Sequence, residues 1–252
     1  MRQNFKKITL ATALCAATMF GGYTHAQAAE FTDAQKQEMQ TIIKDFLMDN
    51  PQVIIDAVEK YRTDQEEQMT KNAKENLASY KDSFMADHLP VAGNPKGDIT
   101  VVEFFDYNCG YCRKAFEDIR KLIKTDENLR VVFQEMPILS PSSKTMAQMA
   151  LAAHNQGKYF EMHTALMDYR GNQSDAAYYK LAADIGLDVA QLKSDMASES
   201  VAAALGKSTD IARKLGIRGT PGFIIGNEIY PGYIGLDGMK DAIADARKAA
   251  SK

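Results

Sequence analysis

The first third of the chain has the apolar pattern of one long helix followed by a second. Thr32 and Gln35 form a capping-box pair at the start of this pattern. Apolar side chains then recur at spacings of three and four, on one face of a helix, at Met39, Ile42, Ile43, Phe46 and Leu47. We expect Asn50–Pro51 to end this helix and to start the next, with Asn50 as N-cap and Pro51 at the first helical position.

The second helix has only a thin apolar stripe, which runs from Ile54 to Phe84 around the polar segment RTDQEEQMTKNAKEN. A helix with so narrow a stripe cannot bury itself well on its own chain. We therefore predict that residues 29–87 form a helical arm that packs against another copy of itself, so that the protein is a homo-oligomer. A solvated linker helix that folds over the rest of the chain is the alternative.

A different pattern follows the arm. Residues 88–98, HLPVAGNPKGD, are rich in Pro, Gly and Asn and are predicted to be a linker between domains. The β-branched and aromatic run ITVVEFFDY then predicts a buried strand, CGYCRKAFEDIRKLIKT has helical spacing, and LRVVFQEM predicts a second strand. The order strand, helix, strand indicates a βαβ unit with parallel strands.

The rest of the chain reads as a helical insert followed by a hairpin and a helix. Consecutive helical patterns fill residues 141–215, so we place the insert at about 140–215. The apolar segments FII and EIY flank Gly226–Asn227, a dipeptide typical of tight hairpin turns. The segment LDGMKDAIADARKAAS closes the chain as a helix. Residues 99–252 are therefore predicted to be one α/β domain.

The N-terminus has the three parts of a secretory signal peptide. Arg2, Lys6 and Lys7 form a basic start, an apolar segment follows, and Ala26-Gln27-Ala28 fits the small-x-small cleavage pattern. The apolar segment is shorter than the roughly 20 residues of a membrane-spanning helix, so a membrane anchor is the weaker interpretation. We expect residues 1–28 to be removed by cleavage near Ala28, and the mature protein to be exported to a bacterial periplasm.

Charge and cysteine content narrow the functional classes. The chain has 30 basic and 33 acidic residues, and the signal peptide contains only basic ones. No nucleic-acid partner is expected for so acidic a protein. Cys15 leaves with the signal peptide, and Cys109 and Cys112 are the cysteines that remain.

Two thiols at C-x-x-C spacing in an oxidising compartment are placed to form a disulfide. A disulfide that closes so short a loop hardly constrains the unfolded chain, so stabilisation of the fold is a poor explanation for the two cysteines. A zinc site needs further ligands, and the histidines His88, His154 and His163 share no ligand spacing with the cysteines. We therefore interpret Cys109 and Cys112 as a redox pair and expect no metal and no cofactor; a metal site and an idle pair are the alternatives.

The helix after the first strand begins at Cys109, where unpaired backbone N–H groups and the helix dipole stabilise an anion. Cys109 is therefore expected to be a thiolate at neutral pH and to act as the nucleophile. Cys112 lies one turn further into the helix and is expected to resolve the mixed disulfide that Cys109 forms.

Two further residues or pairs are candidates for this chemistry. Glu103 lies within the first predicted strand, where burial would make its carboxylate expensive to ionise, so it could carry a proton to or from Cys112. A solvated position at a sheet edge is the alternative. Thr220–Pro221 fits either an ordinary turn or a cis peptide that places Thr220 backbone groups beside the sulfurs.

These motifs in this order, EFFDYNCGYC and GTPGFIIG, resemble the DsbA family of exported thiol:disulfide oxidoreductases over residues 99–250. The resemblance implies a thioredoxin fold with an inserted helical domain. It also implies that Cys109 is the nucleophile, Cys112 the resolving thiol, Glu103 the buried acid and Pro221 the cis-proline. The helical arm is similar to those of ScsC-like and Com1-like relatives, in which such arms drive homo-oligomerisation.

Gly110–Tyr111 between the cysteines departs from DsbA and is the dipeptide of the isomerase DsbC, which Thr220 before the proline also resembles. No histidine stands between the cysteines to stabilise a thiolate, so the disulfide is expected to be less oxidising than that of DsbA. We expect an enzyme that isomerises or forms disulfides in unfolded or wrongly paired secreted proteins, served by a membrane redox partner. A net oxidase of DsbA type, and a non-catalytic holdase chaperone or metal-handling protein, are the alternatives.

Overall fold

A computed structural model describes residues 31–251 of the protein. The predicted signal peptide and its cleavage site near Ala28 lie outside the described residues. The chain divides into two compact units, one ending at Val58 and the other beginning at Glu59, and each is described by itself.

The described part of the first unit consists of helix α1, Asp33–Asp49, and the beginning of helix α2, Gln52–Tyr80. Thr32 and Gln35 form the predicted capping box. The expectation for Asn50 was wrong in part. It is the C-cap of α1, where its backbone N–H and its side-chain Nδ2 both donate to the Phe46 carbonyl at 2.9 Å, and among the described residues its side-chain oxygen accepts no N–H of α2.

Helix α1 buries none of its residues within its own unit. The large apolar side chains that stay exposed along residues 31–58 are Phe31, Met39, Ile42, Ile43, Phe46, Met48, Val53, Ile54, Ile55 and Val58. The apolar face that the sequence predicts is therefore present and uncovered.

The second unit is built on a five-stranded sheet of order β1-β3-β2-β4-β5. Its strands are β1 Val91–Gly93, β2 Ile99–Phe105, β3 Leu129–Glu135, β4 Gly222–Ile225 and β5 Glu228–Pro231. The β2–β3 pair is parallel, as predicted, and the other three pairs are antiparallel. Strand β1 lies within residues 88–98, which the sequence analysis assigned to a linker. Three residues are too few to show a strand period, so only the ladder to β3 defines it.

Both faces of the sheet are covered, which explains the unbroken apolar sequence of β2. Helices α3, Gly110–Thr125, and α9, Gly235–Ala250, pack on the face that carries Val101 and Phe105. The opposite face carries Val102 and Phe104 and is covered by helix α8, Glu199–Lys214. Leu77 near the end of α2, and Phe84 of the 3₁₀ helix η1, Lys81–Met85, are buried on that face too.

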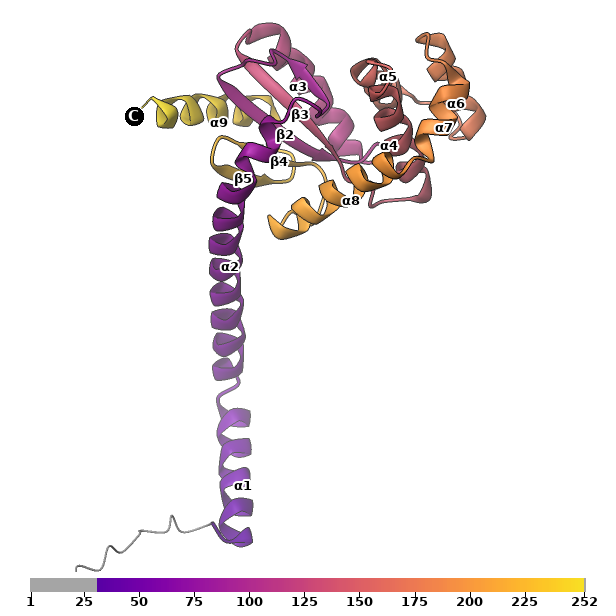
Figure 1. Ribbon diagram of the computed structural model, residues 1–252. Coiled ribbons are helices and arrows are strands. Elements are labelled where there is room, and N and C mark those ends of the chain that lie inside the picture. Colours follow the sequence, from indigo (N-terminus) through magenta and orange to yellow (C-terminus); the bar gives the residue numbers. More distant parts are fainter. Residues whose placement is uncertain (1–30, 252) are drawn as a thin grey trace, which may run out of the picture. The chain divides into compact units, whose positions relative to one another are not determined.

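Helices α4 to α8 lie between β3 and β4 in the chain and form the predicted insert (Figure 1). The bounds of the first four are α4 Pro141–His154, α5 Tyr159–Asp168, α6 Asp175–Asp184 and α7 Val189–Met196. Four of the five helices have a Ser or Asp N-cap that accepts a backbone N–H bond, at Ser140, Ser174, Asp188 and Ser198. The prediction of an α/β thioredoxin fold with an inserted helical domain and a preceding helical arm is confirmed.

Gly226 makes the β4–β5 turn possible. It has φ +62°, a left-handed conformation that other residues adopt at a cost, and a Cβ on it would lie 2.7 Å from the Ala246 Cβ. Gly206, in contrast, lies inside α8 with nothing within 4 Å of a Cβ.

Gly226→Ala is expected to lower the free energy of unfolding by about 1–2 kcal/mol, because alanine adopts a positive φ only at a cost. The clash with the Ala246 Cβ adds to this loss. Gly206→Ala is the matched control and is expected to raise it by about 0.5–1 kcal/mol, since alanine loses less backbone entropy in a helix. Urea unfolding of both variants checks this, and an unchanged or more stable Gly226→Ala would contradict the assignment of the turn.

Candidate active site

The two cysteines differ in access although they lie on one helical turn. Cys109 is the N-cap of α3, and its backbone N–H donates to the Asp106 carbonyl at 3.0 Å. Its side chain is 9% exposed, whereas that of Cys112 is completely buried. Both are free thiols in this structure. A polypeptide that approaches the helix N-terminus can therefore meet the sulfur of Cys109 and not that of Cys112.

Thr220 brings a distant segment to both sulfurs. The Thr220–Pro221 peptide bond is cis. The Thr220 carbonyl oxygen accepts from the Cys109 Sγ at 3.2 Å, across 111 residues of sequence. The Thr220 hydroxyl, on its other side, lies close enough to Cys112 to act on the pKa of that thiol in the lowering direction. The cis alternative of the sequence analysis is the one that the structure has, with the Thr220 backbone beside the sulfur.

Glu103 is completely buried in the middle of β2. It pairs with Phe133 of β3 on one side and Phe223 of β4 on the other, so the alternative of a solvated sheet edge is wrong. Neither carboxyl oxygen has a hydrogen-bond partner within residues 31–251. Burial raises the pKa of the Glu103 carboxyl well above its usual value of about 4.5, and negative charge on Cys109 raises it further.

Burial also raises the pKa of the Cys112 thiol, and the Glu103 carboxylate acts in the same direction. Cys112 is therefore a poor nucleophile unless a neighbouring group takes its proton. Glu103 is the acid whose charge acts on Cys112 most strongly, and both groups favour their neutral forms for the same reason. The structure thus places Glu103 where a proton-transfer role needs it, and the role itself stays a prediction.

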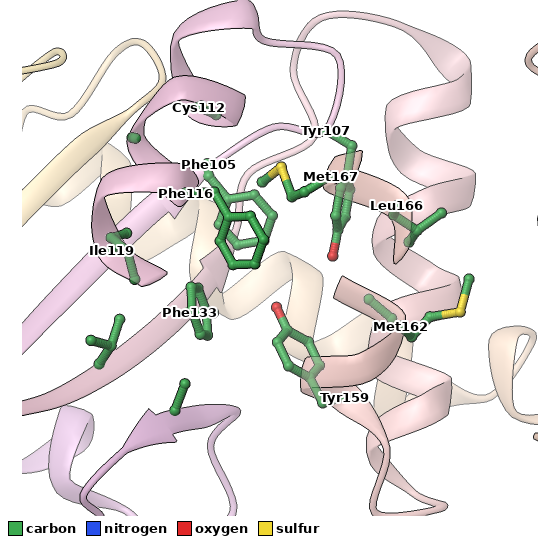
Figure 2. Close-up of a cluster of buried hydrophobic side chains, with 14 of the residues drawn as sticks. Phe105, Tyr107, Cys112, Phe116, Ile119, Phe133, Tyr159, Met162, Leu166 and Met167 are labelled. Carbon is green, nitrogen blue, oxygen red and sulfur yellow. The ribbon is translucent and has the colours of Figure 1, made fainter. Parts of the chain in front are cut away.

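A second buried polar cluster lies in the core of the domain, and the sequence analysis missed it. Glu135 of β3 accepts hydrogen bonds at Oε1 from Tyr107 at 3.0 Å and from Tyr159 at 2.8 Å. Figure 2 shows the two tyrosine hydroxyls directed toward each other. The Tyr107 hydroxyl also lies 3.0 Å from His163 Nδ1. The sequence offered one sign of Glu135, since it is an acid in a predicted buried strand like Glu103. Its tyrosine partners come from other elements, so the sequence could not predict the cluster.

His163 is a core residue and no partner of the cysteines. Phe105, Phe116 and Phe133 surround its ring, with centroids 4.5–4.7 Å away. Burial lowers the pKa of His163 to about 3, and the charge of Arg120 acts in the same direction, so the ring is neutral. Over residues 31–251 no three His, Cys, Asp or Glu side chains lie close enough to hold a metal ion together.

A few large apolar side chains of the domain are exposed, and one of them lies between the two cysteines. Tyr111, between the two cysteines, is 64% exposed, and Ile138 and Leu139 after β3 are 45% and 53% exposed. Within residues 81–251 the other large apolar side chain that is exposed to this degree is Met85. Three of these four side chains therefore belong to the C-x-x-C segment or to the loop after β3.

A family model described as "DSBA-like thioredoxin domain" matches residues 100–244, which is more than half of the chain. The chain belongs to this family. A second family model, "Copper resistance protein ScsC N-terminal domain", matches residues 35–68 of this DSBA-like protein.

Solved structures agree with the assignment. A thioredoxin-like oxidoreductase from Silicibacter pomeroyi DSS-3 is 43% identical with a TM-score of 0.64, over 66% of this chain and 97% of that one. The thiol-disulfide exchange protein α-DsbA2 from Wolbachia pipientis is 29% identical with a TM-score of 0.64, over 69% and 95%. A linker-deletion variant of Proteus mirabilis ScsC, 23% identical with a TM-score of 0.66 over 88% and 100%, shares the fold.

Curated relatives match over part of their length. Na(+)/H(+) antiporter NhaA 1 from Salinispora arenicola is 28% identical over 64% of this chain and 24% of its own. The DSBA-like chain thus spans about a quarter of the length of the antiporter relatives that it matches. Disulfide bond formation protein D from Bacillus subtilis is 22% identical over 61% of this chain and 75% of its own.

Glu103→Gln is expected to change how stability depends on pH. Burial raises the folded-state pKa of Glu103, so its contribution to stability is fully present below about pH 4.5 and is lost as pH rises toward the raised pKa. Above pH 4.5 the variant should therefore gain stability relative to the wild type, by at most about 1.4 kcal/mol per pH unit.

Urea unfolding at several values between pH 4 and pH 8 measures this difference. Glu228→Gln, which removes the same charge from a half-exposed side chain on β5, is the control and should give a flat difference. A flat difference for Glu103→Gln as well would contradict a neutral buried carboxyl.

Proposed function

We propose that the protein is an exported thiol:disulfide oxidoreductase that isomerises or forms disulfide bonds in secreted proteins. The observation that carries the proposal is the arrangement of Cys109, at the N-terminus of α3, with its sulfur 3.2 Å from the Thr220 carbonyl and a buried second thiol one turn away. One sulfur is reachable by a client and the other only by the first, which is the division that disulfide exchange needs.

In the proposed reaction the Cys109 thiolate attacks a disulfide of the client. A bond forms between Cys109 and one client sulfur, and the other client sulfur leaves as a thiolate. That thiolate can attack a different client disulfide, and the last exchange expels Cys109, so that isomerisation has no net oxidation or reduction. If Cys112 attacks Cys109 instead, the client leaves as a dithiol and the enzyme pair is oxidised. The reverse sequence gives the oxidase.

Glu103 is proposed to serve the step in which Cys112 acts. The Cys112 thiol must lose its proton before it can attack, and its burial opposes ionisation. Ionised Glu103 can accept that proton because burial raises its own pKa, which makes its carboxylate a stronger base than an exposed one. In the reverse direction Glu103 returns the proton to the departing Cys112.

Unfolded or wrongly paired polypeptides are the proposed clients. Tyr111, Ile138 and Leu139 offer exposed apolar contacts around Cys109, and such segments are exposed in chains that have not finished folding. The Thr220 carbonyl lies beside the Cys109 sulfur, where an extended client segment can pair with the backbone.

Isomerase or reductase activity is the direction that we favour, with net oxidase as the alternative. Gly110–Tyr111 and Thr220 resemble the isomerase DsbC, as noted above. A membrane-bound reductant would keep the pair reduced for isomerisation, and a membrane-bound oxidant would serve the oxidase. Equilibration with glutathione tests the choice, since a reduction potential near about −120 mV, that of DsbA, would favour the oxidase.

The periplasm is the proposed location. It rests on the predicted signal peptide and on the thiol pair, which functions in an oxidising compartment. Within residues 31–251 none of the helices combines the length and the apolar character needed to cross a membrane.

Residues 29–87 are proposed to join copies of the protein. The support is the apolar face of α1, on which Ile42, Ile43 and Phe46 are each more than half exposed. Monomeric proteins rarely leave an apolar face of this kind uncovered. Several active sites held together could act on one client repeatedly without releasing it.

Replacing Cys112 by serine is expected to trap the mixed disulfide between Cys109 and a client. The reduced Cys112→Ser protein, mixed with scrambled ribonuclease, should give a covalent adduct whose mass is the sum of the two, because no second thiol resolves it. The Cys109→Ser control should give no adduct. A Cys109→Ser/Cys112→Ser double variant that still fulfilled the role of the wild type would favour the holdase or metal-handling alternative.

The double variant Ile43→Asp/Phe46→Asp is expected to reduce the wild-type oligomer to monomers, because it places four charges on the apolar face of each pair of helices in contact. Thr41→Asp/Lys44→Asp, on the opposite side of α1 by helical geometry, is the control and should leave the oligomer intact. Sedimentation equilibrium measures the mass. A monomeric wild type would contradict the proposal.

Point variants are preferable here to removal of residues 29–87. Leu77 and Phe84 lie within that range and are buried against the sheet, so their loss would expose the core of the domain. A truncated protein could then lose activity for a reason unrelated to assembly.

A further inference from the structure

Asp106, three residues before Cys109, joins two loops through a buried carboxylate. Its side chain accepts four hydrogen bonds although the residue is 1% exposed. One oxygen accepts from the Asn108 N–H at 2.8 Å and from the Ser143 hydroxyl at 2.7 Å. The other accepts from the backbone N–H groups of Ile138 and Leu139 at 2.8 and 2.9 Å. Every lone-pair position of this carboxylate is therefore used.

Asn108 makes a second tie between the same loops. Its Nδ2 lies 2.8–3.0 Å from the hydroxyls of Ser140, Ser142 and Ser143 at the start of α4. Its Oδ1 accepts from Gln173 at 2.6 Å. The residue directly before Cys109 is thus fixed to the helical insert by its side chain.

These contacts determine where Ile138 and Leu139 lie. Both backbone N–H groups point inward to Asp106, while both side chains are about half exposed. Asp106 also accepts the Cys109 N–H with its own carbonyl oxygen. One residue therefore holds the reachable cysteine with its backbone and the exposed apolar pair with its side chain.

We propose that Asp106 is a positioning residue that fixes the Ile138–Leu139 pair beside Cys109, where the pair binds an apolar side chain of the client polypeptide next to the disulfide under attack. This inference rests on the proposed function and adds to it the contact that selects polypeptide clients over small disulfides. The occupant is an extended segment of an unfolded client, because a mixed disulfide with Cys109 brings that segment to this position.

The test compares a polypeptide disulfide with a small one in the full-length protein. In Asp106→Asn an amide NH₂ replaces one of the two acceptor oxygens. It then faces N–H donors, either those of Ile138 and Leu139 or that of Asn108, so the hydrogen bonding between the two loops is weakened. The rate constant with scrambled ribonuclease should fall roughly tenfold, the size of effect expected from one buried aliphatic side chain. The rate constant with oxidised glutathione, which has no large apolar side chain for the pair to bind, should fall by much less, so that the ratio of the two rate constants changes.

Ile138→Ser/Leu139→Ser should reproduce this selective loss with Asp106 intact. Both side chains are exposed, so this variant keeps the inference testable if Asp106→Asn does not fold. Asp210→Asn, an exposed aspartate on α8, is the matched control and should change neither rate.

Three results would overturn the inference: equal loss of both rates in Asp106→Asn, no loss in either, or an Ile138→Ser/Leu139→Ser variant that attacks ribonuclease at the wild-type rate. A wild type that reacts with neither disulfide would instead contradict the proposed function. Assembly through this pair of side chains would appear as a change in sedimentation mass of the serine variant without a change in its rates, which also counts against the inference.

Discussion

The enclosed carboxyl group of Glu103 is the constraint on which the rest of the site depends. Strand β2 has neighbours on both edges and packing on both faces, so this carboxyl is completely buried and has no hydrogen-bond partner among the described residues. Its proton affinity rises, and it opposes negative charge on the equally buried Cys112. A buried carboxyl with a raised pKa can accept a proton from a neighbouring thiol and return it, which suits an exchange reaction that must run in both directions.

The two thiols have different roles because a client can reach Cys109 and not the buried Cys112. Segments far apart in the sequence determine this difference in exposure. Thr220 contacts Cys109 from the loop between the insert and β4, and Asp106 binds the residues that precede the insert. The helical insert therefore does more than enlarge the domain. It supplies Ser143 and Gln173, which hold the loop, and Tyr159 and His163, which fill the space beneath it.

The helical arm follows a different physical rule from the domain. Its second helix ends as part of the domain, with Leu77 buried against the sheet, whereas α1 buries nothing within its own unit. The thin stripe of the second helix predicted a helix that cannot bury itself well on its own chain, and α2 buries one residue, Leu77, at its end. Sequence could not separate the two parts of α2, because both have the same helical spacing.

Local sequence patterns predicted most of the helices and strands and the candidate redox pair. Helical periods, the Gly226–Asn227 turn and the capping box at Thr32 are local, so residues within one or two turns decide them. The C-x-x-C pair is local for the same reason. Only the tertiary structure decided that Thr220 meets Cys109, that Glu103 is enclosed, and that Asp106 holds Ile138 and Leu139. Each of these depends on pairing or packing between residues distant in the chain, and no short-range pattern records such contacts.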